Sequence, residues 1–215
     1  AGEVLEVTAS DPGFAADIPA WCERTGNALV EVKPDGGKYI ARIRKEDRAA
    51  PQATKAASAP NGKTIVCFSN DLDRVMAAFV IANAAAAMGN AVTIFFTFWG
   101  LNVLRKENPG PVKKGLLDRM FGMMMPKGPE RLSLSKMHMA GMGTRMMKYV
   151  MKSKNVASLP ELIQSARDAG VKLVACSMSM DVMGIRREEL IEGVEIAGAG
   201  YYLGKADEGN VNLFI

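Results

Sequence analysis

The stretch that decides the fold is VKLVACSMSMD, residues 171–181 of a chain of 215 residues. A short apolar run without Gly or Pro leads to Cys176, and polar, helix-compatible residues follow it. This pattern predicts a buried strand that ends at Ala175, with the thiol in the turn to a helix. Unpaired amides at a helix start and the helix dipole both favour the thiolate, the nucleophilic form of cysteine. The alternative interpretation of Cys176 is a small buried hydrophobic side chain.

Around this stretch, segments with strand and helix patterns alternate through the second part of the chain. Strands are expected at residues 64–68, 91–98, 171–175, 193–196 and 211–214, and helices at 72–88, 159–169 and 186–192. The alternation predicts an α/β domain in three layers, with a mainly parallel sheet between helices.

Ligand sites in such sheets lie at the carboxyl ends of the strands. We therefore expect the pocket residues directly after the strands, next to Cys176: Asn70, Asp71, Trp99, Gly100, Asn102 and Ser177. Asn70 and Asp71 have an alternative role as caps of the following helix. A simple turn is the alternative for residues 99–102. Cys67 also ends a strand and is a candidate resolving thiol for Cys176, with a buried strand position as its alternative.

The first 44 residues predict a smaller domain of order β-α-β-β. Strands are expected at residues 3–7, 28–33 and 38–44, and a helix begins at Asp11-Pro12 and ends near Arg24. The turn sequence Pro34-Asp35-Gly36-Gly37 joins the last two strands as a hairpin. Residues 45–62 have almost no large apolar side chain, which predicts a flexible linker to the domain at residues 63–215.

Composition excludes several classes of protein. Apolar residues make up 48% and charged residues 23% of the chain, as in globular proteins. No apolar run reaches the roughly 18 residues that a membrane-spanning helix needs, and we expect no secretory signal, because the first residues lack a basic region followed by an apolar core. Three scattered cysteines and one histidine fit neither a disulfide framework nor a metal site, so we expect no metal and a reducing cytoplasm.

A Met-rich basic segment interrupts the α/β pattern at about residues 107–155. Ten of the fifteen methionines lie between Met120 and Met151. Between Arg105 and Lys154 there are twelve Lys or Arg residues against three Asp or Glu residues. The segment fits a lid over Cys176, an interface for a protein or a membrane surface, or ordinary core with a basic face. We favour a protein interface, with peripheral membrane contact second. We do not expect nucleic acid, since aromatics are not interleaved with the cations.

Four stretches carry a resemblance to a known family: residues 64–68, the Ala-rich helix, FFTFWGLN at 95–102 and VACSMSMD at 174–181. Together they make residues 63–215 similar to the DsrE/DsrF-like family of sulfur carriers. The resemblance implies that Cys176 carries sulfane sulfur as a persulfide, with the thiol chemistry of a sulfurtransferase. It also implies sulfur donors and acceptors, either proteins or low-molecular-weight thiols, and a homo-oligomer.

Residues 1–44 resemble the second part of a TusA/SirA-like domain, through VTASDPGF at 7–14. The sulfur-accepting Cys-Pro-x-Pro motif of that family is absent, so we interpret this part as a truncated domain. The pair of modules also resembles the C-terminal tail of larger pyridine nucleotide-disulfide oxidoreductases. That likeness implies FAD and NAD(P) in a parent protein, whereas these 215 residues hold no Gly-x-Gly-x-x-Gly motif and no expected cofactor. The alternative function is a non-catalytic interaction or oligomerisation module that docks through the Met-rich basic segment.

Overall fold

The computed structural model describes residues 2–9, 14–46 and 61–215. The chain divides into two compact units, residues 1–59 with 87–89 and residues 60–86 with 90–215. Most of the expected linker, and the expected helix start at Asp11-Pro12, lie outside the described residues.

The N-terminal unit packs one helix against a small antiparallel sheet. Its elements are β1 (Val4–Ala9), α1 (Phe14–Thr25), β2 (Ala28–Asp35) and β3 (Lys38–Arg44), with strand order β1-β3-β2. Ile18 and Cys22 of α1 lie buried against Ala41 and Ile43 of β3. The predicted order β-α-β-β is therefore confirmed.

The larger unit contains a five-stranded parallel sheet of order β7-β6-β5-β4-β8. Its strands are β4 (Gly62–Cys67), β5 (Val92–Phe96), β6 (Lys172–Cys176), β7 (Glu195–Ala197) and β8 (Gly209–Phe214). The helices among them are α2 (Leu72–Ala87), α5 (Leu159–Asp168), α6 (Ser177–Val182) and α7 (Ala199–Asp207). The predicted α/β class and parallel sheet are thus confirmed.

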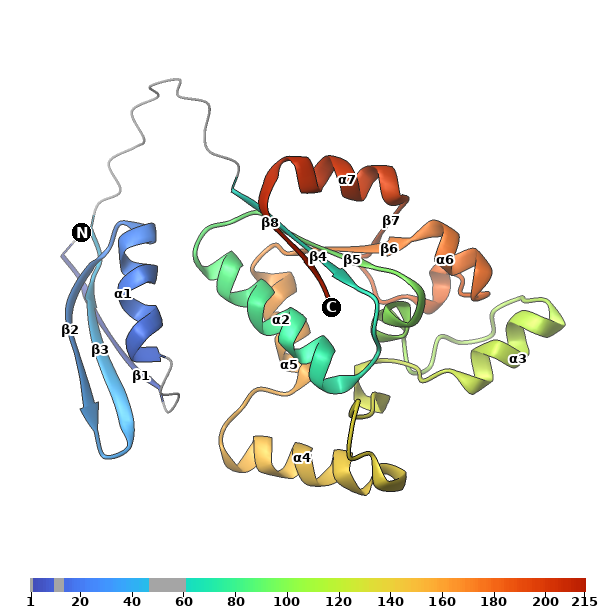
Figure 1. Cartoon of the computed structure of the whole chain (residues 1–215), viewed down its shortest axis with the longest axis horizontal. Helices are drawn as coiled ribbons and strands as arrows, with labels where there is room; N and C mark the ends of the chain where they lie inside the picture. The colour runs from blue at the N-terminus through green and yellow to red at the C-terminus, as the bar shows by residue number, and fades with distance from the viewer. Residues whose placement is uncertain (1, 10–13, 47–60) are drawn as a thin grey trace. The chain divides into compact units, whose positions relative to one another are not determined.

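Helices cover the two faces of this sheet, as Figure 1 shows, with α2 and α5 on one side and α7 on the other. The α2 and α5 face holds the main core, which includes Phe79 and Phe96 at zero exposure. The α7 face holds a smaller cluster around Phe95, Val174 and Cys176. Successive strand residues point to opposite faces, so the position of each residue in its strand decides which core it joins.

Three differences from the expected elements matter for the site and its surroundings. The strand β6 extends through Cys176, which is also the residue that precedes the first turn of α6. The expected helix at 186–192 is reduced to a short 3-10 turn, η4 (Arg187–Glu189). Its Glu189 is buried and faces Arg105. The helix α7 was not expected from the sequence.

The Met-rich basic segment forms two helices, α3 (Leu116–Met124) and α4 (Met142–Ser153), with the short 3-10 turns η2 (Pro129–Arg131) and η3 (Met139–Gly141) between them. Gly143, in the first turn of α4, has no room for a side chain, because a Cβ there would lie 1.8 Å from the carbonyl oxygen of Met137. This glycine permits the close approach that folds the chain back before α4.

Candidate functional site

Cys176 lies at the carboxyl edge of the sheet, at the junction of β6 and α6. Cys176 is buried, with 4% of its surface exposed. In the parallel register, Phe96 pairs with Ala175, so the next residue on each side, Thr97 just after β5 and Cys176 at the end of β6, also lie side by side. Ser179 follows Cys176 by three residues, which is the spacing at which a helix's first turn faces back on the residue before it.

Two hydroxyl groups meet at this thiol. Thr97 Oγ1 and Ser179 Oγ are 2.7 Å apart, and Ser179 is fully buried. Burial alone raises the pKa of Cys176. Hydrogen bonding from the side chain and backbone of Ser179, from the Thr97 hydroxyl and from the backbone of Met178 outweighs that effect and lowers this pKa below its usual value. The arrangement therefore favours a thiolate at Cys176.

Thr97 and Ser179 were not among the residues singled out from the sequence. Ser179 carried a readable signal in its three-residue spacing from Cys176. Thr97 could be linked to Cys176 only through the register of the strands, because the two residues are 79 positions apart in the chain.

Helix α7 supplies the wall opposite the sheet. Tyr201 and Tyr202 pack on the cluster of Phe95, Val174 and Cys176, and the Phe95 and Tyr202 rings have centroids 5.4 Å apart. The thiol thus has apolar and aromatic neighbours on the sheet side and hydroxyls at the sheet edge. Met178, two residues after Cys176 on α6, is 55% exposed.

The structure does not bring Cys67 together with Cys176. Cys67 pairs with Phe96, which pairs with Ala175, so Cys67 faces the α2 and α5 core while Cys176 faces α7. Their strands are also separated by β5, and two strand spacings are about 9.6 Å, beyond the Cα separation of a disulfide. Cys67 donates from Sγ to the Ser69 carbonyl at 3.6 Å, and burial raises its pKa to about 12.

The other expected pocket residues are spread around the edge. Ser177 adjoins Cys176 at the start of α6. Asn70 and Asp71, after β4, line a separate hollow of about 500 Å³ beside Met123–Pro126. The structure therefore places these two residues against the Met-rich basic segment.

Residues 98–104 form a 3-10 turn, η1 (Phe98–Leu104), that serves packing. Gly100 is buried, and a Cβ there would lie 2.0 Å from the carbonyl oxygen of Cys67. Asn102 is fully buried and accepts a weak hydrogen bond from Arg105 at 3.4 Å. Trp99 remains 49% exposed. Close backbone packing explains the Gly in this family-like run.

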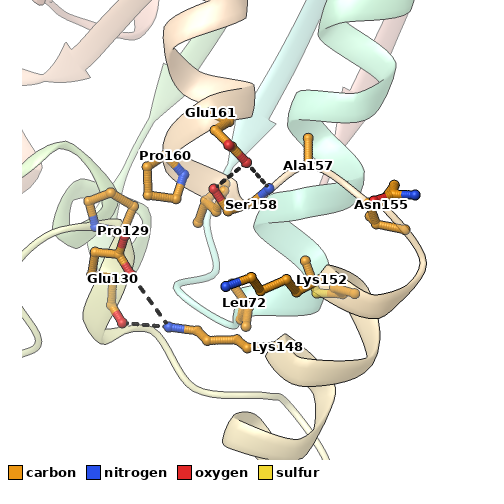
Figure 2. A pocket seen from close by; sticks show the side chains of 13 residues that line it. Leu72, Pro129, Glu130, Lys148, Lys152, Asn155, Ala157, Ser158, Pro160 and Glu161 are labelled. Carbon is orange, nitrogen blue, oxygen red and sulfur yellow. Dashed lines mark hydrogen bonds and ion pairs between the residues drawn. The ribbon is translucent and has the colours of Figure 1, made fainter.

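A cavity of about 610 Å³ does not include Cys176 among its lining residues. Figure 2 shows it between η2, α4 and the start of α5, with Lys152 extending across it. Lys148 donates to the carbonyl oxygen of Glu130 at 2.7 Å, and Ser158 and Glu161 form the cap of α5. These two hydrogen-bonded pairs lie on the wall of the cavity. Because Cys176 is not a lining residue, the cavity is separate from the thiol.

A buried ion cluster fixes the Met-rich basic segment to the larger unit. Glu189 accepts from Arg105 Nη2 at 3.0 Å and from Lys114 Nζ, and all three side chains are at most 7% exposed. Arg186 pairs with Asp118 of α3 at 3.1 Å. These contacts hold α3 in a defined position.

The same segment presents apolar side chains to solvent. Leu116 and Met124 of α3 are 83% and 75% exposed, and Met142, Met146 and Tyr149 of α4 are 62%, 55% and 74% exposed. Surfaces of this kind mark contacts with other molecules. None of the helices in the described ranges is long and apolar enough to span a membrane. Over the same ranges, no cluster of three acidic, cysteine or histidine residues forms a metal site.

Comparison with known proteins bears on the whole chain. The model of the DsrE/DsrF/DrsH-like family matches residues 60–214, and that of sulfurtransferase TusA matches residues 1–45. The uncharacterized protein YrkE of Bacillus subtilis is 57% identical over 152 residues, which cover 71% of this chain and 95% of that protein. The sulfur carrier protein DsrE2 of Allochromatium vinosum is 40% identical over 155 residues, covering 70% and 96%. The sulfur carrier protein TusA of the same organism is 48% identical over 44 residues, covering 20% of this chain and 58% of that protein.

Proposed function

The chain belongs to the DsrE/DsrF/DrsH-like family, and from this membership we propose that it carries sulfane sulfur as a persulfide on Cys176. The observation that carries the proposal is the thiol at the sheet edge, whose pKa is lowered by hydrogen bonding from Ser179 and Thr97 against the opposing effect of burial. The relatives named as sulfur carriers support the class of chemistry.

Loading needs one exchange at sulfur. The Cys176 thiolate attacks the outer sulfur of a donor persulfide, a new S–S bond forms at Cys176, and the S–S bond of the donor breaks. The donor leaves as a thiolate and takes a proton from solvent. Sulfur moves at the sulfane oxidation level, so no external oxidant or reductant is required.

Unloading is the same step in the opposite direction. An acceptor thiolate attacks the outer sulfur, and Cys176 leaves as a thiolate. Groups that stabilise this thiolate help both steps, because a thiol with a lower pKa is also the better leaving group. The Ser179 and Thr97 hydroxyls therefore act on loading and on release.

The placement of Cys67 favours a carrier over a dithiol enzyme. With Cys67 on the other face of the sheet, the outer sulfur on Cys176 passes to a second molecule rather than to an internal thiol. Cys22, the cysteine of the N-terminal unit, is 2% exposed in a packed core, and burial raises its pKa. Neither of these thiols is placed to accept sulfur.

Intact mass after incubation of the reduced protein with polysulfide tests the proposal. We expect a gain of one sulfur mass that reductant reverses, that Cys176→Ser abolishes and that Cys67→Ser leaves unchanged. An unmodified wild-type protein, or an adduct that persists in Cys176→Ser, would refute persulfide formation on Cys176.

The exposed apolar face of α3 and α4 favours a second role as an interaction module. We propose that it contacts an acidic protein surface, including that of a sulfur-transfer partner or a further copy of the chain. From Leu132 to Ala157 the chain holds five Lys or Arg residues and no Asp or Glu, which complements negative charge. Light scattering and pull-down with Met142→Gln and Met146→Gln separate this role from thiol chemistry. Unchanged assembly in both would contradict it, and vesicle binding would assign the face to a membrane.

A further inference from the structure

A third cavity, of about 170 Å³, lies between the start of the Met-rich basic segment and the 3-10 turn η4. It does not include Cys176. Ten residues line it, four of them basic and one acidic: Arg105, Pro109, Gly110, Val112, Lys114, Arg119, Gly122, Met123, Lys127 and Glu189. The cavity volume is well below the roughly 300 Å³ at which pockets for drug-sized ligands begin.

The charges on its inner wall do not balance. Arg105 and Lys114 are almost fully buried and share the single carboxylate of Glu189. That carboxylate also accepts from the backbone N–H of Arg186 at 2.9 Å. Asp118, the acidic residue of α3, is paired with the Arg186 side chain instead. Two buried cations therefore face one carboxylate, and buried charges are ordinarily compensated.

Two buried hydrogen-bond donors, one on Arg105 and one on its neighbour Asn102 outside the cavity lining, also lack partners. Among the described residues, the buried Nε of Arg105 and the buried Nδ2 of Asn102 have no acceptor. Arg105 Nη2 already donates to Glu189 and to the carbonyl oxygen of Gly122, the latter at 3.3 Å. Buried polar groups without partners are uncommon, and these two are both donors. Both atoms have almost no accessible surface, so a ligand in the cavity would not reach them directly, but the guanidinium of Arg105 beside the cavity remains short of acceptors.

Arg119 and Lys127 complete the site from its outer side. Arg119 is exposed and Lys127 is half-buried, and both line the cavity. With Arg105, Lys114 and Glu189 they give a formal charge of +3. We propose that this cavity binds a small oxyanion with two negative charges, of the sulfate, thiosulfate or phosphate type. The volume is too small for a nucleotide or a coenzyme, which occupy pockets of about 300 Å³ or more.

Calorimetric titration of the full chain with sodium thiosulfate, sulfate and phosphate at constant ionic strength tests this site. We expect saturable binding of one anion per chain. The double variant Arg119→Gln with Lys127→Gln should weaken it at least tenfold. Lys136→Gln with Arg145→Gln removes two exposed cations of the same segment outside the cavity and should leave it unchanged.

Absence of saturable binding to any of the three anions would overturn the proposal. Equal weakening in the two double variants would do the same, because it would reduce the effect to general attraction. A preference for thiosulfate over phosphate would assign the site to sulfur oxyanions, and the reverse order to phosphate. Repeating the titration with Cys176→Ser keeps this result independent of persulfide formation, since the cavity lacks that residue.

Discussion

Replacement of Ser179 by Ala tests whether hydroxyl hydrogen bonding controls the reactivity of Cys176. Ser179 is fully buried, and its contact with Thr97 at 2.7 Å fixes both hydroxyls beside the thiol. Burial has the largest single effect on the pKa of Cys176 and raises it, and the Ser179 side chain has the largest effect in the lowering direction. Removal of this hydroxyl should therefore raise the pKa of Cys176.

The magnitude follows from the difference between hydrogen bonds to charged and to neutral groups. The former contribute about 1.5–3 kcal/mol and the latter about 0.5–1.5 kcal/mol. A difference of about 1.4 kcal/mol lowers the ratio of thiolate to thiol tenfold. Nucleophilicity rises with pKa at a Brønsted coefficient of about 0.4–0.5, so each remaining thiolate reacts about threefold faster. Below the pKa of Cys176, we expect alkylation to slow about three- to fourfold.

The assay is the rate of iodoacetamide alkylation of Cys176 as a function of pH, followed by mass spectrometry. Ser177→Ala is the matched control, because Ser177 adjoins the thiol but is not among the groups that lower its pKa. Thr97→Val should slow the reaction less, and the double variant should show less than the sum of the two effects because the hydroxyls contact each other. A wild-type profile in Ser179→Ala, or an equal change in Ser177→Ala, would refute the reasoning.

Three further outcomes follow from the geometry. At pH 8 the native protein should be alkylated at Cys176 and not at Cys67, as peptide mapping can show, because with a pKa of about 12 roughly one Cys67 in ten thousand is ionised. Gly100→Ala should lower the free energy of unfolding by about 2–4 kcal/mol through its clash with backbone, whereas Gly204→Ala, in open space within α7, should be neutral or slightly stabilising in the same urea titration. Glu189→Gln should cost about 3–5 kcal/mol at pH 7 by leaving two buried cations without a carboxylate. Burial raises the pKa of Glu189, but its hydrogen bonds and cationic partners have a larger effect in the opposite direction, so its pKa lies below the ordinary value of 4.5. The carboxylate therefore contributes its full stabilisation of the fold at pH values above 4.5. The difference in free energy of unfolding between wild type and Glu189→Gln should narrow as the pH falls below 4.5.

The sheet could be predicted because its strands are marked in the sequence by short apolar runs. Residues 64–68 and 171–175 lie within two residues of the observed strands β4 and β6. Helix α7 could not, since Gly200 and Gly204 weaken its helical signal and its apolar residues form no clear stripe. It forms because packing on the sheet face around Phe95 buries apolar surface, and this tertiary contact stabilises the helix.

The site divides in the same manner. Cys176 could be predicted as a site residue from its local pattern, because the strand-to-helix junction is a feature of consecutive residues. The contact of Thr97 with Ser179 joins residues 82 positions apart, and it depends on which strands are neighbours and in what register. Gly100 could be read as a pocket residue or a turn until the carbonyl of Cys67 was placed against it.

Register also explains why two cysteines at strand ends of one sheet have opposite properties. Cys67 and Ala175 occupy the same level of the sheet, through Phe96, and both face the α2 and α5 core. Cys176 is one residue further along, so it points to the other face and reaches the edge where amides and hydroxyls are available. The pKa of Cys67 is raised and that of Cys176 lowered, although both are buried. Deep burial without compensating hydrogen bonds raises the pKa of Cys67, whereas hydrogen bonds at the sheet edge outweigh the effect of burial on the pKa of Cys176. Both the depth of burial and the hydrogen-bond donors around the thiol therefore separate the two cysteines.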